Sequence, residues 1–348
     1  MNTGLERARP GQIGDVERIG ARLADYLAAT TAASTRDAYA ADFARFVTWC
    51  EKYGASPLPA APEVVAHYLA DLADTPLRPF RCAHEGAARR PRACRGCRRA
   101  ATYTPATITR RASAIAAAHT AAGLESPTRA NVVREALKGI RRTKGTAPAA
   151  KTPLTVADLR AIVGEHLPAG VKGTRDRALL LVGMAGGFRR SELVGIDREH
   201  VEFVGEGVVI TLPRSKTDQE GAGRKVAIPS GHKGTCPVRA LTAWITAADI
   251  EEGPVFRPVN RHGQIGAGRL TGRGVALTVK HYAAARGKDA RAYSGHSLRA
   301  GFATAAARAG AAERDIMRQT GHRSEAMVRR YIRDGSLFRD NAAGKLGL

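Results

Sequence analysis

The sequence feature that most constrains the fold is an eleven-residue stretch at 143–153, TKGTAPAAKTP, with two prolines and no large apolar side chain. Proline and glycine interrupt regular secondary structure, and a segment without apolar side chains has nothing to bury in a core. Apolar residues recur at helical spacing both before and after this stretch. We therefore predict a linker at 143–153 that joins two separately folded domains.

Residues upstream of the linker have the pattern of a small helical domain. Apolar side chains recur at helical spacing in four stretches, which begin near Ser34, Pro62, Thr104 and Thr128. Between the second and third stretches the chain loses this periodicity and becomes rich in Arg and Cys. The predicted organisation is an N-terminal arm at 1–19 and a helical domain at 20–142 that carries an insertion at 75–101.

Residues 154–348 form the second predicted domain, in which the period of the apolar pattern changes. Val208–Leu212 and Lys225–Ile228 have the composition of β-strands and are separated by a polar loop. Helical spacing on either side predicts helices that begin at or near Thr155, Thr174, Pro237, Leu270, His296, Glu313 and Ser324. The predicted fold is mainly α-helical with a small antiparallel β-sheet, and it ends in a short tail at 333–348.

The net charge of the chain limits the kinds of molecule that it is expected to bind. The chain carries 55 Lys and Arg against 32 Asp and Glu, a formal net charge of +23. Such an excess favours polyanions, with nucleic acid as the leading candidate and an anionic membrane surface as the alternative. No apolar run approaches the roughly 18 residues of a membrane span, and no secretion signal opens the chain. Because the five cysteines also favour reduced thiols, we expect a cytoplasmic protein.

Four short segments concentrate side chains that can do chemistry, at 185–196, 213–229, 295–304 and 320–332. The candidate catalytic residues in them are Arg189, Lys216, His296, Arg299, His322 and Tyr331. His296 and Arg299 are one helical turn apart, so both side chains reach the same patch. Each residue alone has an ordinary structural explanation, such as a helix-end arginine or a core tyrosine. Those explanations do not account for all four segments together.

This set combines cations with a phenol and offers no carboxylate cluster for magnesium, no P-loop and no Gly-x-Ser-x-Gly motif. Paired guanidinium groups can neutralise the negative charge that a phosphodiester spreads over its oxygens in the transition state. Neighbouring cations favour the phenolate of a tyrosine, whose unperturbed pKa is about 10. A lysine can protonate the leaving alkoxide. The set therefore suits metal-free attack of a tyrosine on a phosphodiester.

The sequence resembles the tyrosine recombinases, the family of phage integrases and Xer recombinases. The pair His296-x-x-Arg299, the 23 residues from Arg299 to His322 and the nine from His322 to Tyr331 match the family spacing. GFRRSEL matches the first arginine motif, and SKT followed by KVAIP matches the motif of the β-hairpin lysine. The resemblance is strong from 185 to 332 and limited to general architecture before 150.

The resemblance implies a site-specific recombinase or integrase that needs neither metal nor ATP nor another cofactor. Tyr331 would form a 3′-phosphotyrosyl bond with DNA, His296 would assist its proton transfer, and Lys216 would protonate the departing 5′ oxygen. Contacts to the scissile phosphate would come from Arg189, Arg299 and His322. Glu192 would support the site from behind these residues.

The resemblance also implies a clamp around duplex DNA. A helical core-binding domain of the SAM-like type would grip one face of the attachment site, and the catalytic domain would grip the other. Four copies would assemble on two DNA duplexes as a homotetramer. No membrane partner is expected.

Several alternatives stay open at this point. A type IB topoisomerase would use the same chemistry without exchanging partners, and a non-catalytic DNA-binding protein could retain the fold. The insertion is either a zinc site or a flexible basic loop, with the possible ligands Cys82, His84, Cys94 and Cys97. The tail docks either on a neighbouring copy or on its own domain. The target sequence and the biological task, whether integration, excision, transposition or replicon resolution, are not encoded in these motifs.

Overall fold

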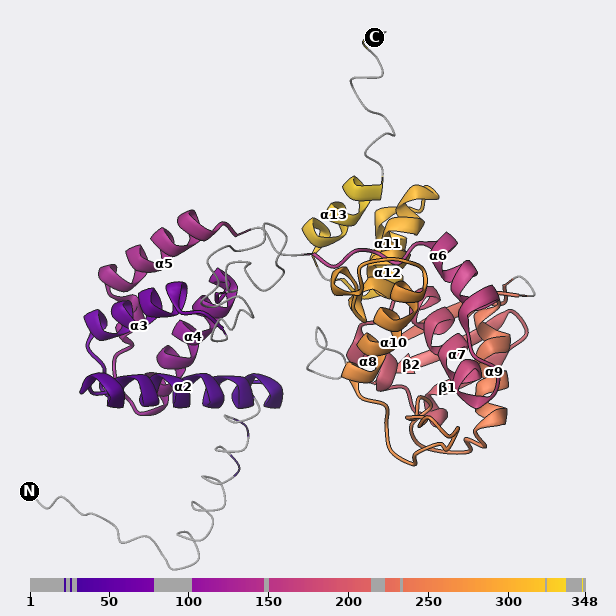
Figure 1. The fold of residues 1–348 in the computed structure, drawn as a ribbon, viewed down its shortest axis with the longest axis horizontal. Coiled ribbons are helices and arrows are strands. Elements are labelled where there is room, and N and C mark those ends of the chain that lie inside the picture. The colour runs from indigo at the N-terminus through magenta and orange to yellow at the C-terminus, as the bar shows by residue number, and fades with distance from the viewer. Residues whose placement is uncertain are drawn as a thin grey trace, which may run out of the picture. The chain divides into compact units, whose positions relative to one another are not determined.

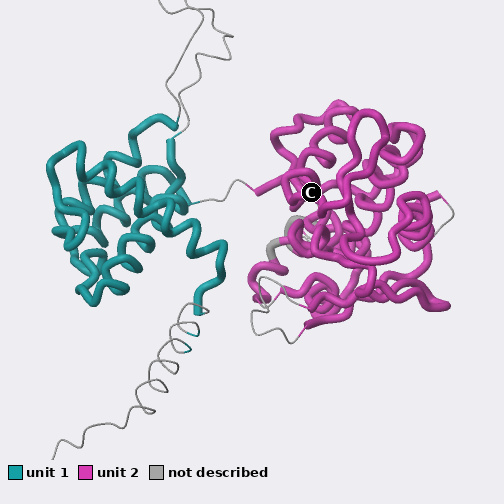
Figure 2. Tube along the Cα trace, turned by 90° about the horizontal axis from the view of Figure 1, so that it is seen from below, with its two compact units in different colours: residues 1–148 teal, residues 149–348 magenta. Residues whose placement is uncertain are grey.

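The computed structural model describes residues 30–77, 102–146, 150–213, 223–231, 234–322 and 324–335, and the single residues 22, 26 and 346. Contacts within the chain divide it into two compact units, Met1–Pro148 and Ala149–Leu348, coloured separately in Figure 2. The division falls inside the stretch that the sequence predicts as a linker. No helix in the described ranges is long and apolar enough to cross a membrane.

The longer helices in the described part of the first unit (Figure 1) are α2 (Ala33–Tyr53), α3 (Pro62–Asp74), α4 (Pro105–Ala121) and α5 (Asn131–Lys144). Gly54 follows α2 in the left-handed conformation, at φ 64°, which a residue without Cβ adopts freely. Pro62 occupies the first position of α3, where its missing N–H forfeits no helical bond. The Thr104 hydroxyl caps α4 by accepting a hydrogen bond from the backbone N–H of Thr107.

The apolar faces of these helices meet in one core, which includes Phe46, Tyr68, Leu69, Ile108, Ile115 and Val133. The bounds of α5 differ from the sequence pattern. The helix begins at Asn131 rather than Thr128, because Pro127–Arg129 forms a separate 3₁₀ turn before it. It then continues to Lys144, inside the predicted linker.

The predicted insertion leaves and re-enters the first unit at one place. Pro76 and Thr102 form an isolated antiparallel bridge, and Lys144 Nζ donates a hydrogen bond to Thr102 Oγ1 at 2.6 Å. Residues 78–101 lie outside the described residues, together with the four possible zinc ligands Cys82, His84, Cys94 and Cys97.

The second unit contains the remaining helices and the sheet (Figure 1). Its helices are α6 (Val156–Ala161), α7 (Val171–Ala185), α8 (Arg190–Val194), α9 (Pro237–Ala247), α10 (Gly272–Ala285), α11 (His296–Arg308), α12 (Glu313–Thr320) and α13 (Glu325–Gly335). The short α8 was not predicted, and α7 begins three residues before Thr174. The buried run 178–182 makes α7 the central helix, against which α9 and α11 pack.

The sheet is antiparallel in the order β1-β2-β3, with β1 (Val201–Val204), β2 (Gly207–Leu212) and β3 (Arg224–Pro229). The sequence predicted only β2 and β3, so the strand count is corrected from two to three. β1 escaped prediction because it is a short edge strand with one buried residue, Val201, and three exposed ones. In β3, by contrast, Val226 and Ile228 alternate with exposed residues and face the core.

The first residues of the second unit are hydrogen-bonded to α11 and to the 3₁₀ turn Ala290–Ala292 before it. The backbone N–H of Leu154 donates to the Ser297 carbonyl at 2.9 Å, and that of Thr152 donates to the Ala292 carbonyl at the same distance. Gly301 of α11 lies so close to this segment that a Cβ built on it would be 2.1 Å from the Leu154 carbonyl oxygen. The contact fixes the helix that carries two of the predicted catalytic residues.

Candidate active site

Arg189 lies at the start of α8, immediately after the turn that ends α7. Gly187 makes this turn at φ 59°, and the buried Phe188 anchors it in the core. Glu192 is buried and accepts two hydrogen bonds from Arg189, one from the backbone N–H at 2.8 Å and one from Nη1 at 2.5 Å. Arg189 is thereby held by its own helix, and Glu192 occupies the supporting position expected from the sequence.

Arg299 is buried on α11, with 1% of its surface exposed. Its Nη1 donates to the carbonyl of Gly187 at 2.7 Å and to the carbonyl of Thr320. Nη2 is buried and has no hydrogen-bond partner within the described part of the chain. Burial, then Arg189, lowers the pKa of Arg299 to about 10, so the group stays charged at neutral pH with donor capacity unused.

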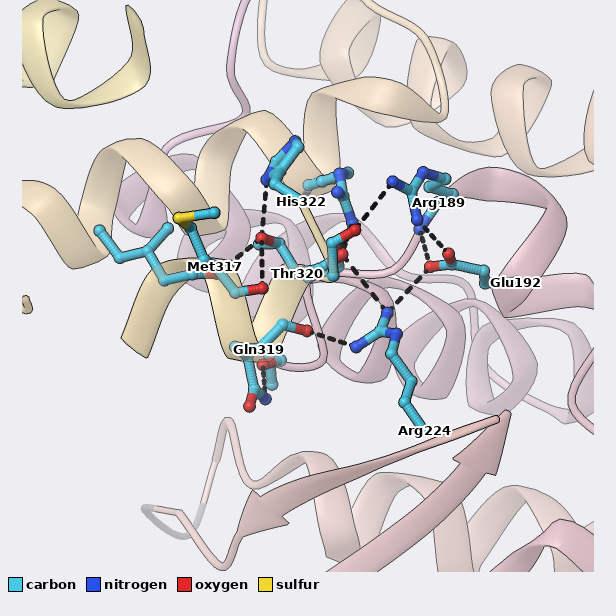
Figure 3. A network of polar contacts seen from close by, with 12 residues as sticks. Arg189, Glu192, Arg224, Met317, Gln319, Thr320 and His322 are labelled. Carbon is cyan, nitrogen blue, oxygen red and sulfur yellow. Dashed lines mark hydrogen bonds and ion pairs between the residues drawn. The ribbon is translucent and has the colours of Figure 1, made fainter. Parts of the chain in front are cut away.

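Three guanidinium groups meet at the C-terminal end of α12. The carbonyl oxygens of Gln319, Thr320 and Gly321 accept hydrogen bonds there from Arg224, Arg299 and Arg189, respectively. Figure 3 shows Arg189 and Arg224 converging on this turn and on Glu192. The last carbonyls of a helix have no partners inside the helix and carry its negative dipole end, which explains why they attract cations.

His322 follows this turn and is 7% exposed. Its Nδ1 is 2.7 Å from Thr320 Oγ1, which is also 2.6 Å from the Ile316 carbonyl oxygen. Burial, followed by the charges of Arg299 and Arg189, lowers the pKa of His322 to about 3. The imidazole is therefore neutral at pH 7.

Tyr331 lies on α13 with its hydroxyl 2.8 Å from His296 Nε2. Its ring packs in a small cluster with Ala303 of α11 and Ile316 of α12, and its centroid is 6.0 Å from that of His322. Although part of the His296 side chain is open to solvent, the surrounding protein and then Arg299 lower the pKa of its imidazole. A neutral His296 whose Nε2 carries no hydrogen can accept the proton of the phenol.

The structure thus brings together five of the six predicted site residues, Arg189, His296, Arg299, His322 and Tyr331. Lys216 falls in the segment 214–222, which lies outside the described residues. Sequence reasoning missed Arg224, which donates from Nη2 to Glu192 at 3.2 Å. The available signal was strand alternation, because Arg224 shares the face of the core residues Val226 and Ile228.

Comparisons with known proteins give the family. The phage integrase family model matches residues 153–336, more than half of the chain. An integrase/recombinase described as a xerD homolog, from Selenomonas ruminantium, is 38% identical over 339 residues and covers 96% of this chain and 92% of its own length. The tyrosine recombinase XerC of Syntrophus aciditrophicus (strain SB) is 32% identical over 204 residues, 55% of this chain and 58% of its own.

Two solved structures share the fold. One is the XerH site-specific recombinase bound to palindromic difH substrate in a post-cleavage complex, with a TM-score of 0.56 and 14% identity over 83% of this chain and 73% of that one. The other is a lambda integrase dimer bound to a COC′ core site, with a TM-score of 0.52 and 14% identity over 97% and 84%. The predicted fold class and family are confirmed, and the chain belongs to the phage integrase family of tyrosine recombinases.

Proposed function

We propose that this recombinase cuts and rejoins duplex DNA at a specific site through a 3′-phosphotyrosyl intermediate, with Tyr331 as the nucleophile. The observation that carries the proposal is the 2.8 Å hydrogen bond between Tyr331 Oη and His296 Nε2, formed beside the guanidinium groups of Arg189 and Arg299. The bond gives the phenol a proton acceptor. The XerH and lambda integrase structures that share the fold are both DNA complexes, which supports DNA as the partner.

In the proposed cleavage step the Tyr331 oxygen attacks the scissile phosphorus and the phenolic proton passes to His296. The bond between phosphorus and the 5′ oxygen breaks, and Lys216 supplies the proton that this oxygen takes up. The role of Lys216 rests on its sequence motif. Religation is the reverse reaction with a 5′ hydroxyl from another strand, and no bond energy is lost between the two steps, so ATP is not required.

The second part of the proposal concerns how the negative charge of the phosphate is neutralised. Arg189 and Arg299 would contact the non-bridging oxygens, and the unused Nη2 of Arg299 is available for such a contact. His322 would donate a further hydrogen bond. These groups perform the charge neutralisation that a metal ion supplies in other phosphoryl-transfer enzymes, so we propose that the reaction needs no metal.

The first unit would bind DNA as the core-binding domain. Its helix α5 exposes a series of basic side chains with only one acidic residue, Glu135, among them; they are Arg134, Lys138, Arg141 and Arg142. Contacts of this kind set affinity and salt dependence through phosphates rather than sequence choice. We further propose that four copies assemble on two duplexes, and that the reaction takes place in the cytoplasm.

The test is covalent capture of DNA. Purified protein is incubated with sheared genomic DNA from its own organism and denatured, and the DNA that stays attached to protein is sequenced to find the target. A nicked duplex with that target then traps the intermediate, because the short fragment beyond the nick diffuses away. We expect an adduct with the parent protein and none with Tyr331→Phe, in buffer that contains EDTA as well as in buffer that contains magnesium.

Each alternative has its own outcome in this assay. An adduct followed by relaxation of supercoils without strand exchange would indicate a topoisomerase. DNA binding without an adduct would indicate a non-catalytic protein, and an adduct that EDTA abolishes would overturn the metal-independent mechanism.

A further inference from the structure

Arg224 contacts two parts of the site, Glu192 on α8 and the turn at the end of α12, and lies on a third element, β3. It is the first residue of β3, and its side chain is 19% exposed. Nη2 donates to Glu192 Oε2 at 3.2 Å and to the Thr320 carbonyl at 3.4 Å, and Nη1 donates to the Gln319 carbonyl at 2.9 Å. One guanidinium group therefore joins the carboxylate behind Arg189 to the turn that holds Arg299 (Figure 3).

We infer that Arg224 is a positioning residue for DNA cleavage, which holds Glu192 and the turn at Gln319–Gly321 in the arrangement that presents Arg189 and Arg299 to the scissile phosphate. The inference rests on the proposed function. Arg224 donates hydrogen bonds to Glu192, Gln319 and Thr320, and it acts through these neighbours.

The shared carboxylate is the first argument. Glu192 is the one acidic side chain that contacts these arginines in the described residues, and its two oxygens serve both Arg189 and Arg224. Without Arg224, Glu192 Oε2 keeps only the backbone N–H of Arg189, and the carboxylate loses one of the three hydrogen bonds that orient it. Because Glu192 orients the Arg189 side chain, a change in the carboxylate changes where that guanidinium points.

The turn is the second argument. The Thr320 carbonyl accepts hydrogen bonds from both Arg224 and Arg299, so the two arginines share one acceptor. Arg224 also packs on Gly321, where a Cβ would lie 2.8 Å from its Nε. The same turn carries the Thr320 hydroxyl that contacts His322. Arg224 thus helps to position the carbonyl groups of Thr320 and Gly321, which accept hydrogen bonds from Arg299 and Arg189.

Burial is the third argument. Desolvation lowers the pKa of Arg224, and only Glu192 offsets it among the nearby charges while Arg189 adds to it. A third arginine beside Arg189 and Arg299 raises the positive charge of a site in which Glu192 is the one contacting carboxylate among the described residues, and that carboxylate is already shared. Holding β3 in place would not require a partly buried cation here, whereas a site that binds a phosphate gains from the added positive charge, and the forked guanidinium can join Glu192 to the carbonyls of the turn.

The test compares Arg224→Gln and Arg224→Lys with the parent by single-turnover cleavage of the nicked substrate and by DNA affinity. We expect Arg224→Gln to slow cleavage about 100-fold at saturating DNA, because misplacement by about 1 Å can have that effect, while DNA affinity changes by less than about threefold. Arg224→Lys keeps the charge but loses the fork, and we expect it to remain at least about tenfold slow.

Arg269→Gln is the matched control. Arg269 makes the same kind of bridge in the same unit, from Nη1 to the Val194 carbonyl and from Nη2 to Asp197, both at 2.6 Å, but these acceptors lie outside the site. We expect its cleavage rate to stay within about threefold of the parent even if its melting temperature falls as much as that of Arg224→Gln.

A double-mutant cycle with Glu192→Gln tests whether Arg224 acts through Glu192. If Arg224 acts through Glu192, the double variant is about as slow as the slower single variant, whereas independent effects multiply. Multiplying losses, parent-like cleavage by Arg224→Lys, or an equal loss in Arg269→Gln would each overturn the inference. A parent protein that forms no adduct would overturn the proposed function instead.

Discussion

The Thr320 hydroxyl has one proton and two close neighbours that can accept it, besides the more distant Met317 carbonyl at 3.5 Å. Oγ1 is 2.6 Å from the Ile316 carbonyl and 2.7 Å from His322 Nδ1. When the proton points to Ile316, Nδ1–H of a neutral His322 donates to the hydroxyl, and Nε2 has only a lone pair to offer. When the proton points to Nδ1, Nε2 carries the hydrogen and can donate to a phosphate oxygen. Thr320 therefore controls which tautomer His322 presents.

We predict that Thr320→Val, which removes the hydroxyl at nearly constant volume, lowers the cleavage rate about tenfold at saturating DNA, as expected for one charge-assisted hydrogen bond. Thr320→Ser keeps the hydroxyl and is expected to retain most of the rate. The measurement is single-turnover cleavage of the nicked substrate. Equal rates for the serine and valine variants would show that the hydroxyl has no part in the reaction.

The titration of His296 predicts the pH dependence of cleavage. Burial and then Arg299 and Arg189 lower its pKa from 6.5, so in the DNA-free protein the neutral, proton-accepting form persists to lower pH than for an ordinary histidine. At subsaturating DNA, which reports the free enzyme, we expect the cleavage rate to decline at acidic pH with a midpoint below 6.5. At saturating DNA, the phosphate charge moves the decline to higher pH.

The control for this profile is His296→Asn, in which the acidic limb should disappear along with most of the rate. A decline at subsaturating DNA whose midpoint lies above 6.5 would contradict the lowered pKa.

Residue spacing and motifs predicted most of this site and its support Glu192, but not Arg224 or Thr320. His296 and Arg299 share a helix face, and this follows from their separation alone. Arg224 acts through the carbonyls and side chains of other elements, and such partners become visible only when α8, α12 and β3 are assembled. No local pattern reports which backbone carbonyls a distant arginine will reach.

At the scale of elements, the close approach of α11 to the segment before α6 is the most sensitive contact. We predict that Gly301→Ala destabilises the second unit by about 1–3 kcal/mol, because the new Cβ would be 2.1 Å from the Leu154 carbonyl oxygen, and overpacking against backbone exceeds the gain in helix propensity. Urea unfolding followed through the buried Trp244 measures the effect.

The matched substitution is Gly164→Ala in the same unit, where nothing lies within 4 Å of the added Cβ. It should change the unfolding free energy by less than about 0.5 kcal/mol. Equal destabilisation by the two variants would mean that the contact between Gly301 and Leu154 is not as close as described.

Helices were predicted well where their ends carry a chemical signal. Gly54, Pro62 and Thr155 all stand at helix boundaries, and each has a conformational or hydrogen-bonding reason to do so. β1 has no comparable signal, since an edge strand with mostly exposed side chains lacks the alternation that marks β3. Its pairing with β2 depends on tertiary context, which explains why the sequence indicated two strands instead of three.

At the scale of the whole molecule, the proposed nucleophile and its proposed proton acceptor belong to one chain. Tyr331 contacts His296 of its own copy, and α13 packs on α11 and α12 of the same unit. We predict that each copy cleaves with its own tyrosine. A mixture of Tyr331→Phe and Arg299→Gln proteins should therefore form no adduct, because neither chain has a complete site.

The measurement is covalent trapping with the two variants mixed in equal amounts on one substrate. The control is a mixture of each variant with parent protein, in which adduct should persist. An adduct in the mixture of the two variants would mean that the tyrosine of one copy enters the site of another.

The bridge between Pro76 and Thr102 has a consequence for how this protein can diversify. Two residues that pair at the start and at the end of a segment fix the points where the segment leaves and rejoins the domain, whatever the length of chain between them. Evolution or an engineer could graft a different module between α3 and α4, or trim the present one to a short turn, while the helices that receive it keep their packing.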